Sequence, residues 1–132
     1  VITLHTNATE ENHHLLNAEA FAKMKPGVTI VNTARGKLID SDALLKALES
    51  GQVGAASLDV LENENGLYYY ARMGDVIPNP ELAALRAMPN VLLTDHTAFY
   101  TYEAVKSMVL SVLESASAFA EGLPTRHDVT DR

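Results

Sequence analysis

The sequence predicts an α/β fold built on a parallel sheet, and two observations support this prediction. Short apolar segments typical of strands alternate with segments whose apolar residues recur at helical spacing. Strand, helix and strand also follow one another within a few dozen residues, as in a βαβ unit. Such units form parallel sheets with right-handed crossovers, so we expect this topology for the 132-residue chain.

Four apolar segments are expected to be strands. They are Val1–Leu4, Val28–Asn32, Ala55–Asp59 and Val91–Leu93. The second and the fourth are rich in Val, Ile or Leu, which is typical of strands buried on both faces.

Two short helices are predicted between these strands. The first covers Ala18–Met24 and ends before a Pro-Gly pair. The second covers Asp42–Glu49, with Asp40 or Ser41 as its N-cap and Gly51 as its C-terminal stop.

A longer helix is predicted from Tyr102 to Glu121. Its apolar residues form a wide stripe, which we expect to pack on a neighbouring domain or subunit. A stripe and a sheet edge left uncovered would favour self-association, so a homo-oligomer is expected. The stripe consists of Val105, Met108, Val109, Val112, Leu113, Ala116, Phe119 and Ala120.

A long loop is expected from Leu61 to Pro80, because no periodicity holds there and Asn, Gly and Pro are frequent. Within it, Tyr68-Tyr69-Tyr70 could pack the loop down or contact a partner or substrate. The polar tail from Pro124 to Arg132 is expected to be frayed.

Composition excludes several classes of partner. A net charge of −7 argues against nucleic acids and anionic membranes. The chain has no cysteine, which excludes disulfides and thiol chemistry and fits a cytoplasmic location. No apolar run approaches the roughly 20 residues needed to cross a bilayer.

A titratable residue closes or follows each predicted strand. These are His5, Arg35, Asp59 and His96. In a parallel sheet these positions share the carboxyl edge, where open α/β sheets bind ligands. Each residue alone could be structural, but their joint placement indicates a site.

These residue types suit hydride transfer to a 2-oxo acid. A histidine beside a carboxylate, here Glu62 or Glu64, can act as acid and base near neutral pH. An arginine offers a planar fork for a substrate carboxylate. No metal site is expected, because the adjacent His13 and His14 would not share a helix face and no second ligand pair is evident.

Three ordered motifs carry a family resemblance. Val31–Gly36 reads VNTARG, Ser57–Glu64 reads SLDVLENE, and Asn90–Phe99 reads NVLLTDHTAF. With them the chain resembles the D-isomer-specific 2-hydroxyacid dehydrogenases. The Asn-Gly-Leu-Tyr-Tyr-Tyr loop and the His-Thr-Ala-Phe-Tyr-Thr run are similar to the D-lactate dehydrogenase branch.

The resemblance implies a role for each matching residue. Arg35 would bind the substrate carboxylate and carbonyl oxygen, and His96 would be the acid/base with Glu64 as its partner. NAD would be the cofactor, and a small 2-oxo or 2-hydroxy acid the substrate, with pyruvate and D-lactate favoured. The remaining implied site residues are Asp59 beside the nicotinamide, Thr6, Asn7, Asn12, Thr33 and Ala34 along the cofactor, and Phe99 at the substrate pocket.

The resemblance also implies that the chain is a portion of a larger enzyme. Residues 1–98 would be the second half of a Rossmann-type doubly wound NAD-binding domain. Residues 99–132 would be a long C-terminal helix and tail that return to an absent substrate domain. No Gly-x-Gly-x-x-Gly occurs in the chain, and in this family it would lie upstream. The chain alone is therefore expected to bind NADH weakly and to turn over negligibly.

Two departures from the family pattern stand out. Thr6-Asn7 replaces a small residue followed by proline, which leaves that cofactor loop less rigid. Asp95 places a second carboxylate next to His96, where proline or glycine is commoner.

Two other functions stay open. One is a non-catalytic oligomerisation or interaction module, although such a module has no physical reason to keep Arg35, Glu64 and His96. The other is a formate- or glyoxylate-type member of the same superfamily. Formate dehydrogenases pair the histidine with glutamine, so Glu64 disfavours that assignment.

Overall fold

The structure, a computed structural model, describes residues 1–69, 71, 74–77, 79–125 and 127. Within them a parallel sheet has the strand order β1-β2-β3-β4. The prediction of a parallel sheet is confirmed, although β3 begins two residues earlier than expected. The strands are β1 (Ile2–Leu4), β2 (Val28–Asn32), β3 (Val53–Leu58) and β4 (Val91–Leu93).

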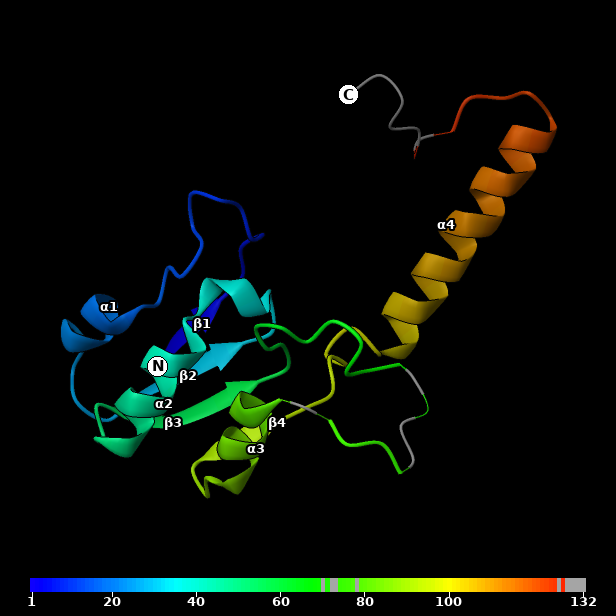
Figure 1. The fold of residues 1–132 in the computed structure, drawn as a ribbon. Helices are drawn as coiled ribbons and strands as arrows, with labels where there is room; N and C mark the ends of the chain where they lie inside the picture. The colour runs from blue at the N-terminus through cyan, green and yellow to red at the C-terminus, as the bar shows by residue number, and fades with distance from the viewer. Residues whose placement is uncertain (70, 72–73, 78, 126, 128–132) are drawn as a thin grey trace. The chain divides into compact units, whose positions relative to one another are not determined.

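Three short helices cover one face of this sheet (Figure 1). They are α1 (Ala18–Ala22), α2 (Ser41–Glu49) and α3 (Pro80–Ala87), with a 3₁₀ turn, η1 (Gly36–Leu38), before α2. Because the strands advance in one direction through right-handed crossovers, all the helices fall on the same side. The layer is thus half of a doubly wound arrangement.

Helix α3 was not predicted from the sequence. It lies at the end of the expected loop, and its start signals are ordinary ones: Asn79 caps the amide of Leu82 with its side chain, and Pro80 occupies the first turn. Of the two candidates for the N-cap of α2, Asp40 is the one observed. Its side-chain carboxylate accepts a hydrogen bond of 3.0 Å from the amide of Ala43.

The core lies between the helices and the sheet face that they cover. In register, Ile30 pairs with Ala56 on that face, and both are buried. The next row, Val31 with Ser57 and Leu92, belongs to the opposite face, where Leu92 is 62% exposed. The alternation of side chains therefore gives the first unit one buried face and one open face.

The chain divides into two compact units, Val1–Thr97 and Ala98–Arg132. The second unit contains α4 (Tyr102–Ala120), capped by the side chain of Thr101. Its predicted helix is confirmed to within one residue. No residue of α4 is buried, and Met108, Val109 and Phe119 of the predicted stripe are exposed. None of the described helices is long and apolar enough to cross a membrane.

Candidate active site at the carboxyl edge of the sheet

The parallel strands bring three loops to one edge of the first unit. Arg35 lies in the loop after β2, Glu64 in the loop after β3, and His96 in the loop after β4. The carboxyl edge of such a sheet is where its loops can assemble a ligand site. The topology expected from the sequence is therefore the one that the structure shows.

His96 and Glu64 form a hydrogen-bonded pair. The distance from Nδ1 of the imidazole to Oε1 of the carboxylate is 2.8 Å, and the side chains are 29% and 19% exposed. The other carboxylate oxygen, Oε2, accepts a bond of 2.8 Å from the amide of Leu61, which holds the glutamate in place. With Nδ1 bound to Glu64, Nε2 is the ring nitrogen suited to meet a substrate.

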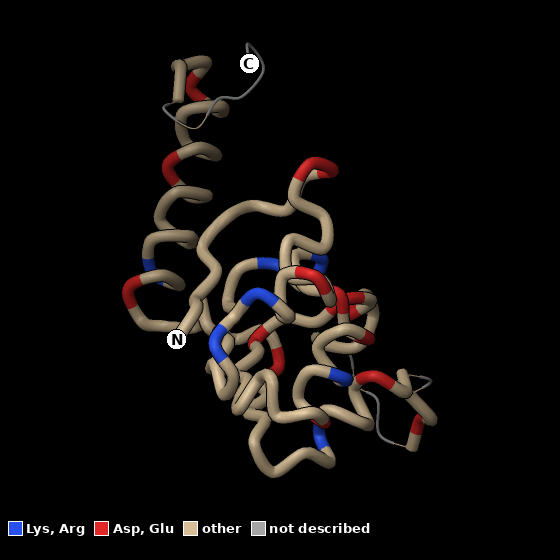
Figure 2. The backbone as a smooth tube through the Cα atoms, turned by 90° about the vertical axis from the view of Figure 1, so that its left-hand side faces the viewer, with Lys and Arg blue, Asp and Glu red and all other residues tan. Residues whose placement is uncertain are grey.

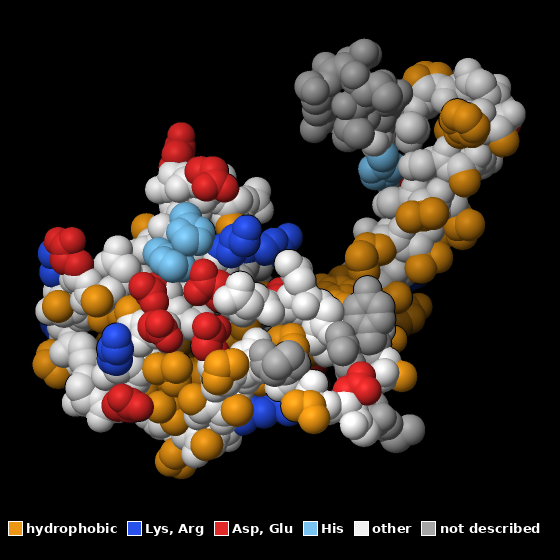
Figure 3. Space-filling model, viewed as in Figure 1, with side chains coloured by type: hydrophobic (Ala, Val, Ile, Leu, Met, Phe, Trp, Pro, Cys, Tyr) orange, Lys and Arg blue, Asp and Glu red, His pale blue; other side chains and the backbone are white. Residues whose placement is uncertain are grey.

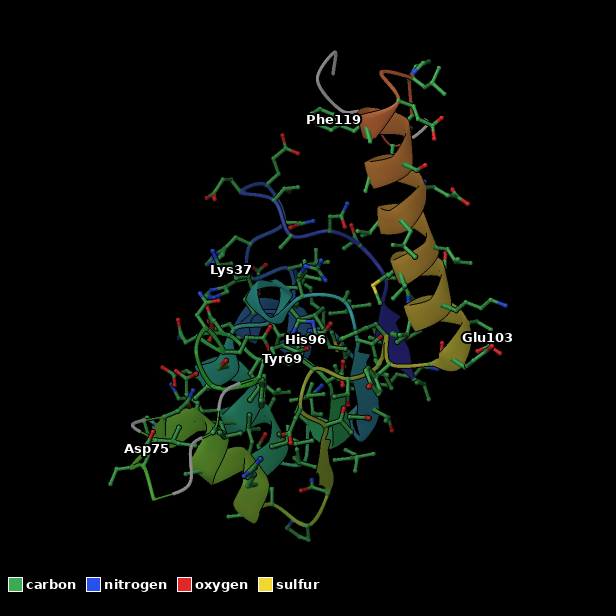
Figure 4. The ribbon with its side chains drawn as sticks, turned by 90° about the vertical axis from the view of Figure 1, so that its right-hand side faces the viewer. Lys37, Tyr69, Asp75, His96, Glu103 and Phe119 are labelled. Atoms are coloured by element: carbon green, nitrogen blue, oxygen red, sulfur yellow. The ribbon has the colours of Figure 1, made fainter. Side chains whose placement is uncertain are left out.

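The backbone at His96 has an unusual conformation. Its φ of 54° lies in the left-handed region, where non-glycine residues are uncommon and residues under functional constraint are enriched. The hydroxyl of Tyr69 donates a hydrogen bond to the His96 carbonyl oxygen, and Figure 4 shows the two residues side by side. Tyr69 therefore ties the long loop to the histidine, while Tyr70 lies outside the described residues.

The loops after β3 and β4 are joined through Asp59. This residue is 3% exposed and accepts hydrogen bonds from the hydroxyl of Thr94 and, at 2.9 Å, from the amide of Thr97. The two contacts flank His96 on either side in sequence. A buried carboxylate therefore helps to set the path of the backbone that carries the imidazole.

Asn32 shapes the Arg35 loop and was not recognised from the sequence as a site residue. It is fully buried at the end of β2. Its amide nitrogen donates to the carbonyl of Arg35 at 2.9 Å, and its amide oxygen accepts from the amide of Ala34 at 3.0 Å. The sequence does contain a signal for this role, which is an asparagine at the end of a mostly apolar strand. A buried side-chain amide needs hydrogen-bond partners, and here the partners are backbone groups of the next loop.

Gly36 allows the arginine loop to meet the glutamate loop. A Cβ at this glycine would lie 2.0 Å from the carbonyl oxygen of Leu61 and 2.5 Å from the amide nitrogen of Glu62. Only a residue without a side chain permits this backbone-to-backbone approach. Arg35 itself is exposed, with its guanidinium donating to the Ala34 carbonyl at 2.6 Å.

The predicted cofactor residues form a polar rim. The side-chain amide of Asn12 donates to the Asn7 carbonyl at 2.7 Å, which closes the loop after β1, and Thr6 is exposed on it. Thr33 is exposed after β2. These hydroxyl and amide groups are uncharged donors and acceptors, a set that fits the ribose and carboxamide groups of a dinucleotide.

Glu62 is not the partner of His96. Its Oε1 lies 2.7 Å from Nε2 of His14 and 3.8 Å from Nε2 of His13. The two adjacent histidines lie in a turn and not in a helix, so the argument that they would not share a helix face does not apply to them. His14 has φ 52°, and the two rings stack with centroids 3.9 Å apart.

Asp95 and Phe99 are the remaining residues that the sequence singles out. Asp95 pairs with Arg86 at 3.3 Å on the surface. Its charge also acts on Tyr68: burial, followed by the charges of Asp95 and Glu64, raises the pKa of Tyr68 above its usual value, so its phenol stays protonated. Phe99 belongs to the second unit, where it packs edge-on against Tyr100, and its place in a substrate pocket stays a prediction.

Comparison with known proteins identifies relatives of the chain. Residues 1–98 match the family described as D-isomer specific 2-hydroxyacid dehydrogenase, NAD binding domain. The chain is 44% identical over 119 residues to an aromatic 2-oxoacid reductase of Clostridium sporogenes, covering 90% of this chain and 36% of that protein. It is 46% identical over 122 residues to a D-lactate dehydrogenase of Escherichia coli, covering 92% of this chain and 37% of that protein.

Solved structures give the same result. A D-lactate dehydrogenase from Treponema pallidum superposes with a TM-score of 0.92 at 38% identity, covering 97% of this chain and 39% of that one. A D-lactate dehydrogenase with NAD⁺ from Lactobacillus jensenii gives 0.87 at 32% identity, covering 97% and 38%. The chain thus spans just over a third of the length of these relatives. The family match, the parallel half-sheet and the ordered motifs agree. The chain belongs to the D-isomer specific 2-hydroxyacid dehydrogenases and forms part of their NAD-binding domain.

Proposed function

We propose that this chain supplies catalytic and cofactor-binding residues to an NAD-dependent D-2-hydroxyacid dehydrogenase that reduces a small 2-oxo acid, with pyruvate as the first candidate. The observation that supports this most directly is the His96–Glu64 hydrogen bond of 2.8 Å, at the sheet edge that also carries Arg35. The similarity to D-lactate dehydrogenases points to the same chemistry.

Each of the three residues has one task. When bound, NADH supplies a hydride to the carbonyl carbon of the substrate. His96, protonated on Nε2, gives its proton to the carbonyl oxygen, so that the ketone becomes a secondary alcohol. Glu64 holds the ring through Nδ1 and stabilises its protonated form. Arg35 binds the substrate carboxylate through its planar guanidinium.

The other site residues have supporting tasks in this proposal. Asp59 lies beside the nicotinamide, and Phe99 borders the substrate. Residues 99–132 connect the NAD-binding domain to a substrate domain, the enzyme is a homo-oligomer, and its location is the cytoplasm. The cofactor contacts are made by Thr6, Asn7, Asn12, Thr33 and Ala34.

A chimeric enzyme tests the proposal. This chain replaces the matching 37% of the Escherichia coli D-lactate dehydrogenase, to which it is 46% identical. The oxidation of NADH by the chimera is then measured with pyruvate as the substrate. We expect turnover, and we expect His96→Gln to lower kcat about 1,000-fold, because it removes the proton donor. The chain without the host segment is expected to be nearly inactive.

Two variants of the chimera complete the test. Arg35→Lys is expected to raise KM for pyruvate about 10-fold or more, because the two-pronged contact with the carboxylate is lost. His127→Gln, a change in the second unit, is the control for losing an imidazole. A folded chimera that binds NADH but keeps its kcat after His96→Gln would show that this proposal is wrong.

An aromatic 2-oxo acid is the second candidate substrate. The reductase of Clostridium sporogenes is named for such substrates, and it is as similar to this chain as the D-lactate dehydrogenases are. Comparing kcat/KM for phenylpyruvate and pyruvate in the chimera decides between them.

A non-catalytic interaction module remains the alternative outside enzymology. The exposed apolar residues of α4, among them Val112 and Leu113, favour it. A chimera that assembles and binds NADH but lacks turnover would support this alternative.

A further inference from the structure

We propose that His13, His14 and Glu62 form a binding site for a divalent transition-metal ion such as Zn²⁺. Each residue offers one ligand atom, and these atoms all lie within 4.8 Å of one another. In the described part of the chain, this is the one group of three that meets this spacing. The site is separate from the His96–Glu64 pair.

The distances between the ligand atoms are close to those that a metal requires. Nε2 of His14 lies 2.7 Å from Oε1 of Glu62, and Nε2 of His13 lies 3.8 Å from the same oxygen. Ligands bonded at about 2.0–2.2 Å in a tetrahedral site are roughly 3.4 Å apart. A bound ion would therefore lengthen the first distance by about 0.7 Å and shorten the second by about 0.4 Å, and the two rings would rotate so that both lone pairs point at the ion.

The local backbone produces this arrangement. In a helix or a strand, adjacent side chains point in different directions. Here the left-handed conformation of His14 turns the chain, so that the rings of His13 and His14 stack with an angle of 25° between their planes. The Nε2 atoms of both rings lie within 4 Å of the same oxygen of Glu62. Figure 3 shows paired histidine side chains on the first unit with acidic side chains beside them.

Neighbouring polar groups lie near two of the three ligands, at or beyond the outer limit of hydrogen-bond distance. Oδ2 of Asp40 lies 3.8 Å from Nδ1 of His14, and the hydroxyl of Ser41 donates to Oε2 of Glu62 at 3.4 Å. A carboxylate behind the distant nitrogen of a ligating histidine is the usual support of such ligands in metalloproteins. The backbone amide of His14 is also fixed, by a bond of 2.9 Å to the carbonyl of Lys37.

The alternative is a structural His14–Glu62 ion pair. Such a pair accounts for the position of His14. It gives no reason for Nε2 of His13 to lie 3.8 Å from the same oxygen of Glu62, because two protonated rings would repel each other. A metal ion uses both rings in their neutral form. Figure 2 shows both acidic and basic segments along the backbone of the first unit, so it is the three ligand atoms themselves that favour a cation.

The ligand set indicates the class of metal. Two imidazoles and one carboxylate suit Zn²⁺, Ni²⁺ or Cu²⁺ better than Mg²⁺ or Ca²⁺, which prefer oxygen ligands alone. Three protein ligands leave a coordination position for water or another group. His13 is 44% exposed, so an ion can reach the site from solvent.

Titration calorimetry with ZnCl₂ on the full chain, freed of metal by a chelator, tests the site. We expect one ion per chain. His13→Gln and Glu62→Gln should each weaken binding at least about 100-fold, because a ligand is lost. Asp40→Asn should weaken it about 10-fold while keeping the cap of α2, because asparagine is an equally good N-cap.

Two further measurements make the result decisive. Substitution with Co²⁺ should give visible absorption bands of a four- or five-coordinate ion, which His13→Gln abolishes. His96→Gln and His5→Gln should bind Zn²⁺ as the original chain does, and circular dichroism checks that every variant is folded. The proposal is overturned if the folded chain fails to bind Zn²⁺. It is also overturned if one ion per chain still binds after His13→Gln, or if binding is lost after His96→Gln.

Discussion

Glu62 and Glu64 are separated by one residue, yet each pairs with a different histidine. Glu64 meets Nδ1 of His96 at 2.8 Å, whereas Glu62 meets Nε2 of His14 at 2.7 Å. The burial of the two pairs is nearly the same, since the glutamates are 19% and 17% exposed. Burial and distance therefore do not distinguish an acid/base pair from the proposed metal site.

The difference between the pairs lies in which nitrogen is used and in what stands behind it. His96 has Nδ1 occupied and can present Nε2 to a substrate. His14 points Nε2 at its glutamate and has Asp40 behind Nδ1, with the second ring of His13 stacked against it. Asn63, between the glutamates, has φ 57°. This left-handed residue, a conformation that asparagine tolerates, breaks the strand-like alternation that would place both carboxylates on one side.

The largest expected effect comes from Gly36→Ala, which disturbs the loops of both pairs at once. The new methyl group would collide with the backbone of Leu61, so either the Arg35 loop or the glutamate loop must move. We expect a loss of about 3 kcal/mol in the free energy of unfolding, measured by urea denaturation.

Gly51→Ala is the matched control for that substitution. Gly51 has φ 77° but open space around its Cα, so alanine there should cost only about 1 kcal/mol. A Gly36 variant no less stable than the Gly51 variant would show that the two loops do not depend on the close approach.

The next effect separates the two glutamates in the chimeric enzyme. Glu64→Gln should lower kcat about 100-fold, or about 2.7 kcal/mol, because His96 loses the charge that stabilises its protonated form. KM for NADH should hardly change. Glu62→Gln should lower kcat less and act mainly on metal binding. Equal losses of kcat in the two variants would contradict the division of roles.

The smallest effect concerns pH and the surroundings of Glu62. Burial, followed by the charges of Glu62 and Asp42, raises the pKa of Glu81 above its usual value. The folded state then holds its proton more tightly than the unfolded state, so this residue makes stability fall as pH rises through its raised pKa. Glu81→Gln should flatten that slope above the usual pKa of a glutamate, by a few tenths of a kcal/mol.

Thermal unfolding at several pH values measures this slope. Glu103→Gln removes a carboxylate from the corresponding first turn of α4 and serves as the control. If both variants change the slope equally, the pH dependence comes from overall charge and not from the group around Glu62.

Much of the fold followed from the sequence because its signals are local. Apolar runs and capping residues such as Asp40 report structure within a few positions. A histidine with a carboxylate partner was also predictable, since parallel strands must end at one edge, but the choice of Glu64 over Glu62 came from the family resemblance. Helix α3 was missed because its apolar face is short: Leu82 and Leu85 are its buried residues, too few to reveal a period.

The His13–His14–Glu62 group could not be predicted, because it depends on a backbone angle. His14 has φ 52°, and the identity of a histidine does not specify that backbone angle. The role of Asn32 was hidden for a related reason, since its two bonds reach backbone groups whose positions only the folded loop defines.

Helix α4 has 19 residues and is therefore about 28 Å long, with no side chain buried along it. An isolated helix of this length is only marginally stable in water, because tertiary packing supplies most helical stability. The folding of α4 and the covering of its apolar stripe are thus expected to be one coupled event. Helical content measured by circular dichroism against protein concentration would then serve as a direct gauge of assembly.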